Sequence, residues 1–208
     1  MQIHKVEQGT PEWLALRVGI PTTSEFSNLV TPTGKASTSV KAFALGLAAD
    51  KLAGYVVDPT PTNFAMERGK ELEEKAANHY TFENEVEVET IGFVTNDEMT
   101  AGCSPDRFVG KDGLLEIKCP MKPKFMSCLW DVNHGKCPTD YFIQVQGQLM
   151  ITERKWCDLF FFHPEIGTCC IRIEPDPEIF KTLNAQLKVL SGIRTEAIAM
   201  LNPEKAAA

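Results

Sequence analysis

The sequence predicts an α/β fold in which a central mixed β-sheet is flanked by α-helices. Three observations predict it. Apolar residues recur at the helical period through most of the first 80 residues. Short runs rich in β-branched and aromatic residues, typical of strands, follow residue 85. A helix, two more strands and a long amphipathic helix then complete the chain, an order that excludes an all-β sandwich and a helical bundle.

Start and stop signals define the first helix, because Thr10 is a suitable N-cap, Pro11 suits the first helical position, and Gly19 to Pro21 stop the helix. The other helices are predicted from caps and apolar periodicity, and cover residues 22–30, 39–53, 63–80, 140–151 and a last segment that begins at 176–177. We expect the helices over 39–53 and 63–80 to pack on the sheet.

The strands are predicted from their β-branched and aromatic residues, and their ranges are 86–94, 99–103, 114–118, 157–162 and 169–174. The first three are expected to form a three-strand meander. A glycine-containing hairpin turn over 109–113 leads into the third of them.

Length and composition fit one domain, because 208 residues, 43% of them hydrophobic, suffice for one substantial core. We expect a single domain over 1–203 and a disordered tail over 204–208. The first residues lack a signal-peptide pattern, and the longest apolar stretch, 43–49, is far shorter than the roughly 20 residues that span a membrane. The expected location is therefore the cytoplasm, with no membrane partner and with the seven cysteines reduced.

The net charge of −7 argues against a protein that coats nucleic acid through a positive exterior. The charge is unevenly distributed, however. Between residues 104 and 137 six basic residues outnumber four acidic ones. A local contact with phosphate groups is therefore compatible with the acidic total.

Two carboxylates and a lysine are predicted to converge at one sheet edge. Glu116 and Lys118 share a strand face because side chains alternate along a strand, and the hairpin folds Asp106 back beside them. Carboxylates and a backbone carbonyl are ligands that Mg²⁺ prefers, and the ion would neutralise charge developing on a phosphodiester. Lys118 would either help to deprotonate the attacking water or stabilise the pentavalent phosphate.

The alternative is an exposed charge pattern of no chemical significance, which is the usual meaning of an isolated E-x-K triplet. Here the polar pair interrupts an apolar strand, Pro105–Asp106 precedes it across the hairpin, and Cys119–Pro120 ends the strand. This conjunction favours an active site.

With these residues the sequence resembles the PD-(D/E)xK nucleases, and more narrowly the phage lambda exonuclease and YqaJ-type viral recombinase family. The blocks that carry the resemblance are Val6–Gly9 with Trp13, Leu16 and Arg17, then Gly19–Glu25, Gly69–Lys70 with Glu73, Cys103–Asp106, Leu115–Pro120 and Gln144–Gln146. The resemblance implies a restriction-endonuclease-like fold for the whole domain.

It also implies residue roles. Asp106, Glu116 and the Ile117 carbonyl would bind Mg²⁺, with Mn²⁺ as the alternative ion. Glu73 would face the same site, unless it is a solvated helix charge. Gln144 would lie near the scissile phosphate, unless its amide is bonded to backbone within the helix.

A terminal 5′ phosphate would be received by a guanidinium and three hydroxyls, those of Arg17, Thr22, Ser24 and Ser104. A guanidinium, hydroxyls and a helix N-terminus are suitable partners for a dianion. Without the family, Ser24 is interpreted only as an N-cap.

The sequence departs from the family pattern at two positions. Arg107 stands where the lambda-type pattern favours glycine, and its side chain is expected to touch DNA or to face solvent. Gln148 stands where helicase-linked nucleases have tyrosine. The tryptophans Trp13, Trp130 and Trp156 are assigned no site role, because tryptophan in an amphipathic pattern belongs more often to the core.

The function that the resemblance implies is a Mg²⁺-dependent 5′-to-3′ exonuclease. It would degrade one strand of linear double-stranded DNA as a ring-shaped homotrimer, and would pass the 3′ overhang to a single-strand annealing protein in phage-type recombination. Two alternatives stay open: a structure- or site-specific endonuclease of the same fold, and a non-catalytic DNA-end-binding module.

Overall fold

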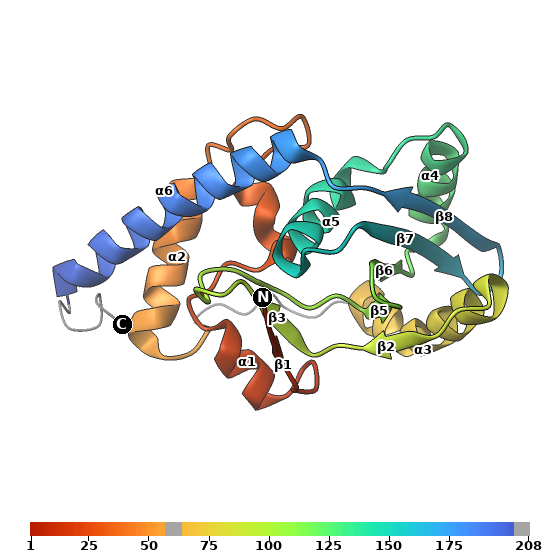
Figure 1. Ribbon diagram of the computed structural model, residues 1–208, viewed down its shortest axis with the longest axis horizontal. Helices are drawn as coiled ribbons and strands as arrows, with labels where there is room; N and C mark the ends of the chain where they lie inside the picture. The colour runs from red at the N-terminus through yellow and green to blue at the C-terminus, as the bar shows by residue number, and fades with distance from the viewer. Residues whose placement is uncertain (57–63, 202–208) are drawn as a thin grey trace.

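The computed structural model describes residues 1–56 and 64–201 (Figure 1). Its elements are β1 (Gln2–His4), α1 (Pro11–Arg17), the 3₁₀ helix η1 (Thr23–Asn28), α2 (Val40–Ala53), α3 (Phe64–Asn84), β2 (Val88–Thr90), β3 (Phe93–Thr95), β4 (Gly102–Cys103), β5 (Arg107–Val109), β6 (Gly113–Lys118), α4 (Lys122–Asn133), α5 (Thr139–Thr152), β7 (Trp156–His163), β8 (Gly167–Ile173) and α6 (Pro177–Leu201). The predicted tail over 204–208 lies outside the described residues, and the domain boundary at 203 stays a prediction.

The main sheet has five strands in the order β2-β5-β6-β7-β8. Strands β6 and β7 are parallel and the other neighbours are antiparallel, so the sheet is mixed, as predicted. Helices flank it, and the predicted α/β class is confirmed. No helix in the described ranges is long and apolar enough to cross a membrane.

The predicted three-strand meander is wrong, because a second sheet of order β1-β3-β4 takes part of it. The chain leaves the main sheet after β2 and crosses the N-terminal segment at Gly92. A Cβ atom at Gly92 would lie 1.9 Å from the Val6 carbonyl oxygen, so only glycine permits this close crossing. The three-residue strand β1 is too short to give a periodic signal in the sequence.

The two faces of the main sheet carry separate cores. On β6, Leu115 and Ile117 belong to a cluster with residues of α3, whereas Leu114 points into the larger cluster that includes α5. Glu116 and Lys118 alternate with Leu115 and Ile117, so they face the α5 side. Strand alternation thus selects which helix can reach the predicted catalytic pair.

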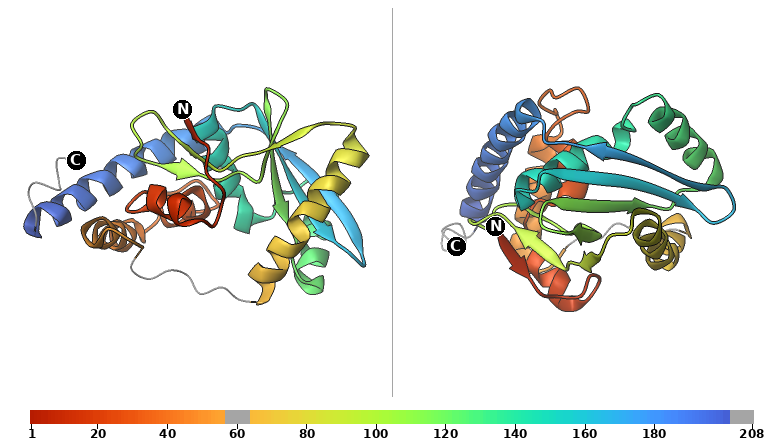
Figure 2. Two further views of the ribbon diagram at one scale, coloured as in Figure 1. Left: turned by 90° about the horizontal axis from the view of Figure 1, so that it is seen from below. Right: turned by 45° about the vertical axis from the view of Figure 1, so that its right-hand side comes forward.

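The helices are placed partly as predicted. Helix α3 packs against β6, but α2 packs mainly against α6 and not on the sheet. Figures 1 and 2 show α2 and α6 side by side, with α5 between them and the main sheet. Helix α4 was not predicted, since only Phe125 and Cys128 are buried along it and its apolar period is weak.

The predicted starts of two helices are confirmed, and each has a side-chain cap. The Thr10 hydroxyl accepts the Trp13 N–H, and the Asp176 carboxylate accepts the N–H groups of Glu178 and Ile179. The segment expected as a short helix from residue 22 is the 3₁₀ helix η1, with Thr22 at its N-cap position and no side-chain capping bond. Ser24 lies inside η1, so its interpretation as an N-cap is wrong.

Gly147 allows α5 to lie directly on η1. A Cβ atom there would lie 2.6 Å from Phe26 Cδ2 and 2.9 Å from Thr23 Cγ2, and both of those side chains are buried. We expect Gly147→Ala to lower the free energy of unfolding by about 1–3 kcal/mol through overpacking. Urea denaturation measures this.

The matched control is Gly192→Ala in α6, where nothing lies within 4 Å of the added Cβ atom. Alanine favours a helix interior, so this variant should be as stable as the wild type or more stable. Equal stability of the two variants would contradict the proposed close packing.

Candidate active site

Most of the predicted site residues line one cleft with a volume of about 220 Å³, but Glu73 and Ile117 are not in its lining. Its lining includes the carboxylates Asp106 and Glu116 together with Lys118 and Gln144. The other lining residues are Gln8, Trp13, Arg17, Thr22, Thr23, Ser24 and Ser104. Segments separated by more than 100 residues therefore form one concave surface.

The Glu116 carboxylate accepts three side-chain hydrogen bonds in the cleft, and it is only 2% exposed. Its Oε1 accepts hydrogen bonds from Lys118 Nζ and from Gln144 Nε2, both at 2.6 Å. Its Oε2 accepts a bond of 2.7 Å from Gln148 Nε2. The alternative in which the Gln144 amide binds only backbone is wrong.

Gln148 was missed as a site residue. The sequence held one signal for it: it follows Gln144 by four residues, which is one helical turn, so both amides lie on one face of α5. That spacing alone does not say what the face contacts.

Asp106 completes the edge of the sheet beside Glu116. The register of β5 with β6 ends at Arg107 and Leu115, so the next backbone N–H on that side, that of Ile117, has no strand partner. Asp106 Oδ2 accepts this N–H at 2.6 Å. Since the N–H and C=O of one strand residue point to the same side, the Ile117 carbonyl faces the side on which Asp106 lies.

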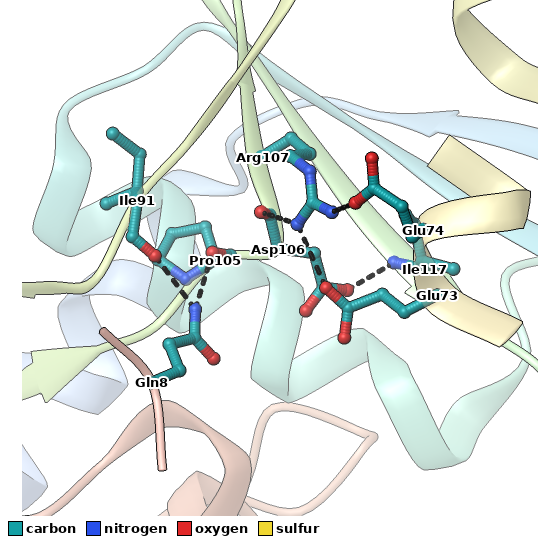
Figure 3. Close-up of polar contacts among 8 residues, drawn as sticks. All are labelled: Gln8, Glu73, Glu74, Ile91, Pro105, Asp106, Arg107 and Ile117. Atoms are coloured by element: carbon teal, nitrogen blue, oxygen red, sulfur yellow. Dashed lines mark hydrogen bonds and ion pairs between the residues drawn. The ribbon is translucent and has the colours of Figure 1, made fainter. Parts of the chain in front are cut away.

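The backbone before Asp106 is fixed by Gln8, a second residue that was missed. Gln8 Nε2 donates to the carbonyl oxygens of Ile91, at 2.8 Å, and Pro105, at 3.3 Å (Figure 3). The side chain comes from the N-terminal segment and also lines the cleft. It holds the Pro105–Asp106 segment against the rest of the sheet edge.

Desolvation and neighbouring charge shape the protonation of the cleft. Desolvation raises the pKa of Asp106 well above its usual range, and the charge of Glu116 raises it further. Desolvation opposes the charged form of Lys118, but the carboxylates of Glu116 and Asp106 outweigh it and raise the Lys118 pKa. Lys118 is therefore a cation at neutral pH.

The raised pKa of Asp106 predicts how stability depends on pH without metal. Below the unfolded pKa of about 3.9, Asp106 is protonated in both states. As pH rises above that value, Asp106 ionises in the unfolded chain but stays protonated in the folded protein. The free energy of unfolding therefore falls with rising pH until the pKa of folded Asp106 is reached. Urea unfolding in EDTA from acid to neutral pH should show the wild type losing stability relative to Asp106→Asn. A constant difference between the two proteins would contradict the shift.

Arg107 neither faces solvent nor is free to touch DNA, so both expectations for it are wrong. It is 6% exposed, and its Nη1 donates to Glu73 Oε1 at 2.9 Å and to the Asp106 carbonyl oxygen at 2.6 Å. Its Nη2 donates to Glu74 Oε2 at 2.8 Å (Figure 3). The guanidinium joins β5 to α3 and fixes the backbone of Asp106.

Glu73 lies close to the site but not in its lining. It is half-buried and paired with Arg107, so it is not simply a solvated helix charge. Its charge contributes to the raised pKa of Asp106, after desolvation and the effects of Glu116 and Lys118.

The second half of the cleft is a cluster of hydroxyls around Arg17. Arg17 Nη2 donates to Thr22 Oγ1 at 3.2 Å, and Ser24 Oγ lies 3.3 Å from the same oxygen. The Arg17 guanidinium stacks 3.9 Å above the Trp13 ring, and Trp13 Nε1 donates to Ser104 Oγ at 2.8 Å. The assignment of Trp13 to the core is wrong, because this half-buried ring lines the cleft.

The oxygen donors of the cleft suit a hard cation. In the part of the chain that the structure describes, no three His, Cys, Asp or Glu side chains are grouped to hold a metal ion. The carboxylates of Asp106 and Glu116 line the same cleft, and the Ile117 carbonyl faces the side on which Asp106 lies. Such a partial oxygen set fits Mg²⁺, which keeps several of its waters when bound. The seven cysteines, all in the described ranges, are free thiols.

Comparison with known proteins finds one matching family model and several solved structures of similar fold. The model of the YqaJ-like viral recombinase domain matches residues 12–155. The crystal structure of an alkaline exonuclease, LHK-Exo from Laribacter hongkongensis, is similar with a TM-score of 0.81 and 28% identity, covering 95% of this chain and 99% of that chain. The structure of LHK-Exo in complex with dAMP matches with a TM-score of 0.80.

Two further relatives are more distant. A phage-related exonuclease from Haemophilus somnus has a TM-score of 0.70 at 15% identity over 88% of this chain and 96% of that chain, which shows the shared fold alone. An uncharacterized protein of Acanthamoeba polyphaga mimivirus is 31% identical over 112 residues, which are 48% of this chain and only 20% of that protein. The mixed sheet with flanking helices is thus the fold of these nuclease structures, and the chain belongs to the YqaJ-like viral recombinase family.

Proposed function

We propose that this protein is a Mg²⁺-dependent exonuclease that degrades one strand of linear double-stranded DNA from its 5′ end. The observation that carries the proposal is that one cleft holds both Asp106, Glu116 and Lys118 and the hydroxyl cluster around Arg17. The exonuclease relatives support the same class of reaction.

The acidic half of the cleft would carry the chemistry. Asp106, Glu116 and the Ile117 carbonyl would hold Mg²⁺, which supplies Lewis acidity and a more acidic water. Lys118 keeps its proton at neutral pH, because the two carboxylates raise its pKa. As a cation, Lys118 would stabilise the negative charge that develops on the phosphate. Gln144 orients Glu116 through their hydrogen bond.

The half of the cleft around Arg17, where the Thr22 hydroxyl also donates to Glu25 Oε2 at 2.9 Å, would select the DNA end. A terminal phosphate carries two negative charges, and the Arg17 guanidinium with the hydroxyls of Thr22, Ser24 and Ser104 offers it charge-assisted hydrogen bonds. An internal phosphodiester has one charge and a chain on both sides, so it suits this enclosed cluster less well. The LHK-Exo complex with dAMP, a nucleoside monophosphate, supports a mononucleotide-sized site.

Family membership supports the remaining parts of the proposal. The subunits would form a ring-shaped trimer around the DNA, and the 3′ single strand would pass to a single-strand annealing protein in recombination. The setting would be the cytoplasm of a bacterial cell.

The test uses linear duplex DNA with a 5′ phosphate on one end only, in Mg²⁺ or in EDTA, with circular duplex as the control. We expect Mg²⁺-dependent loss of the phosphorylated strand from its 5′ end and no cutting of circles. Cutting of circles would indicate an endonuclease of the same fold. Binding without any cutting would indicate an end-binding module.

A further inference from the structure

The ammonium of Lys118 has a second neighbour that the proposed mechanism does not use. Its Nζ donates to Glu116 Oε1, and it also lies over the Tyr141 ring, 5.3 Å from the ring centre. An aromatic face attracts a cation within about 6 Å of its centre, because the faces of the ring carry negative partial charge. Lys118 therefore contacts both a carboxylate and an aromatic face.

The Tyr141 ring is placed beside Lys118 by the neighbouring strand. In the parallel register of β6 with β7, Lys118 is the partner of Phe161. The Phe161 side chain is fully buried in the core cluster that includes residues of α5. Its ring centre lies 5.6 Å from that of Tyr141, and the two rings are inclined at 58°. This packing fixes the Tyr141 ring next to the strand position that carries Lys118.

Tyr141 belongs to the same face of α5 as two residues of the site. It precedes Gln144 by three positions and Gln148 by seven, so the three side chains lie along one side of the helix. The two glutamines bond the Glu116 carboxylate, and Tyr141 contacts the lysine that pairs with this carboxylate. One face of α5 therefore contacts both members of the ion pair.

The ring contacts Lys118 without being part of the cleft surface. Lys118 lines the cleft, whereas the half-buried Tyr141 does not. A cation bound at Glu116 would weaken the ion pair of Glu116 with Lys118, because it neutralises the carboxylate. The contact with the ring does not depend on that charge and would continue to hold the ammonium.

We infer that Tyr141 is a positioning residue whose aromatic face holds the Lys118 ammonium where it meets the phosphate. The inference rests on the role of Lys118 in the proposed function. It adds a residue that affects the rate of cleavage through Lys118 and contacts neither the DNA nor the ion.

The test compares variants of the full chain on 5′-phosphorylated linear duplex DNA in Mg²⁺. Tyr141→Leu removes the aromatic face, and its turnover number should fall about twofold to thirtyfold, the equivalent of one contact between a cation and an aromatic ring. KM should be unchanged, because Tyr141 does not line the cleft. Tyr141→Phe keeps the face and should turn over DNA at the wild-type rate.

The matched control is Phe142→Leu. Phe142 is the next residue of α5, is likewise half-buried and packs against the same core cluster. Its side chain points about 100° away around the helix, so it does not share the face that carries Tyr141. This variant should keep the wild-type turnover number.

A double-mutant cycle separates positioning from a merely structural role. In Lys118→Met the ring has no ammonium to hold, so adding Tyr141→Leu should change the turnover number by less than about twofold. If Tyr141→Leu does not fold, Tyr141→Met replaces it with the same expected results.

The outcomes distinguish the inference from the proposed function. An equal fall on adding Tyr141→Leu to the wild type and to Lys118→Met would overturn the inference and leave the proposed function standing. The same holds for wild-type turnover in Tyr141→Leu, or for a fall in Tyr141→Phe as large as that in Tyr141→Leu. Absence of cleavage by the wild type would overturn both.

Discussion

Replacing Lys118 by methionine should lower the turnover number on linear duplex DNA by about a hundredfold to a thousandfold, the usual cost of losing one preorganised group that stabilises transition-state charge. Methionine fills a similar volume but carries no charge. Lys118 Nζ lies in the cleft, 2.6 Å from Glu116 Oε1, and its raised pKa keeps it cationic. The measurement is the rate at saturating 5′-phosphorylated DNA in Mg²⁺.

The matched control is Lys124→Met. Lys124 Nζ lies 5.8 Å from the centre of the Tyr141 ring, and Lys118 Nζ lies 5.3 Å from the centre of the same ring. Lys124, however, is half-exposed, pairs with Asp140 and does not line the cleft. Its variant should turn over DNA at the wild-type rate. Wild-type turnover in the Lys118 variant would refute the catalytic role proposed for its charge.

The second large effect is expected at Arg17. In Arg17→Lys, the preference for a 5′-phosphorylated end over a 5′-hydroxyl end should fall by about tenfold to a hundredfold, the equivalent of one charged hydrogen bond. Lysine keeps the charge but loses the planar fork that can bind a phosphate through two donors, and it stacks less well on Trp13. The two rates are compared on duplexes that differ only at the end group.

Arg154→Lys provides the control, because the Arg154 guanidinium also stacks on an aromatic ring, 3.7 Å above Phe108, and its hydrogen-bond partners within residues 1–56 and 64–201 are the backbone carbonyls of Gly110 and Gly113. It should retain the wild-type preference. If Arg17→Lys also retains the preference, the end phosphate is bound elsewhere and the proposed polarity loses its physical basis.

Local spacing was enough to predict that Glu116, Lys118 and Asp106 lie together in one site. Strand alternation places Glu116 and Lys118 on one face, and a short hairpin returns Asp106 to their side, so neither inference needs the rest of the chain. The residues around Arg17 were predicted from family resemblance, because hydroxyls in a capped turn have no distinctive period. The structure brings these residues together in the same cleft.

The errors concern contacts between distant segments. Arg107 is buried because α3 presents Glu73 and Glu74, more than 30 residues earlier in the chain, and nothing near Arg107 in the sequence indicates this. Gln8 and Gln148 were missed for the same reason, because the role of each depends on a hydrogen bond to a distant segment. The prediction of a three-strand meander was wrong because the crossing at Gly92 depends on contact with the N-terminal segment. The periodicity of apolar residues predicts a helix or strand, whereas the segment that packs against it depends on the tertiary structure as a whole.

Helix α5 touches both halves of the cleft. Gly147 lies against Phe26 and Thr23 of η1, next to the hydroxyl cluster, while Gln144 and Gln148 hold Glu116 from the same helix. One rigid rod thereby sets the spacing between the place where a strand end would be gripped and the place where the backbone would be cut. The distance between the bound strand end and the cleaved bond would then be fixed by the fold. The released fragments should therefore have one uniform size whatever the base sequence.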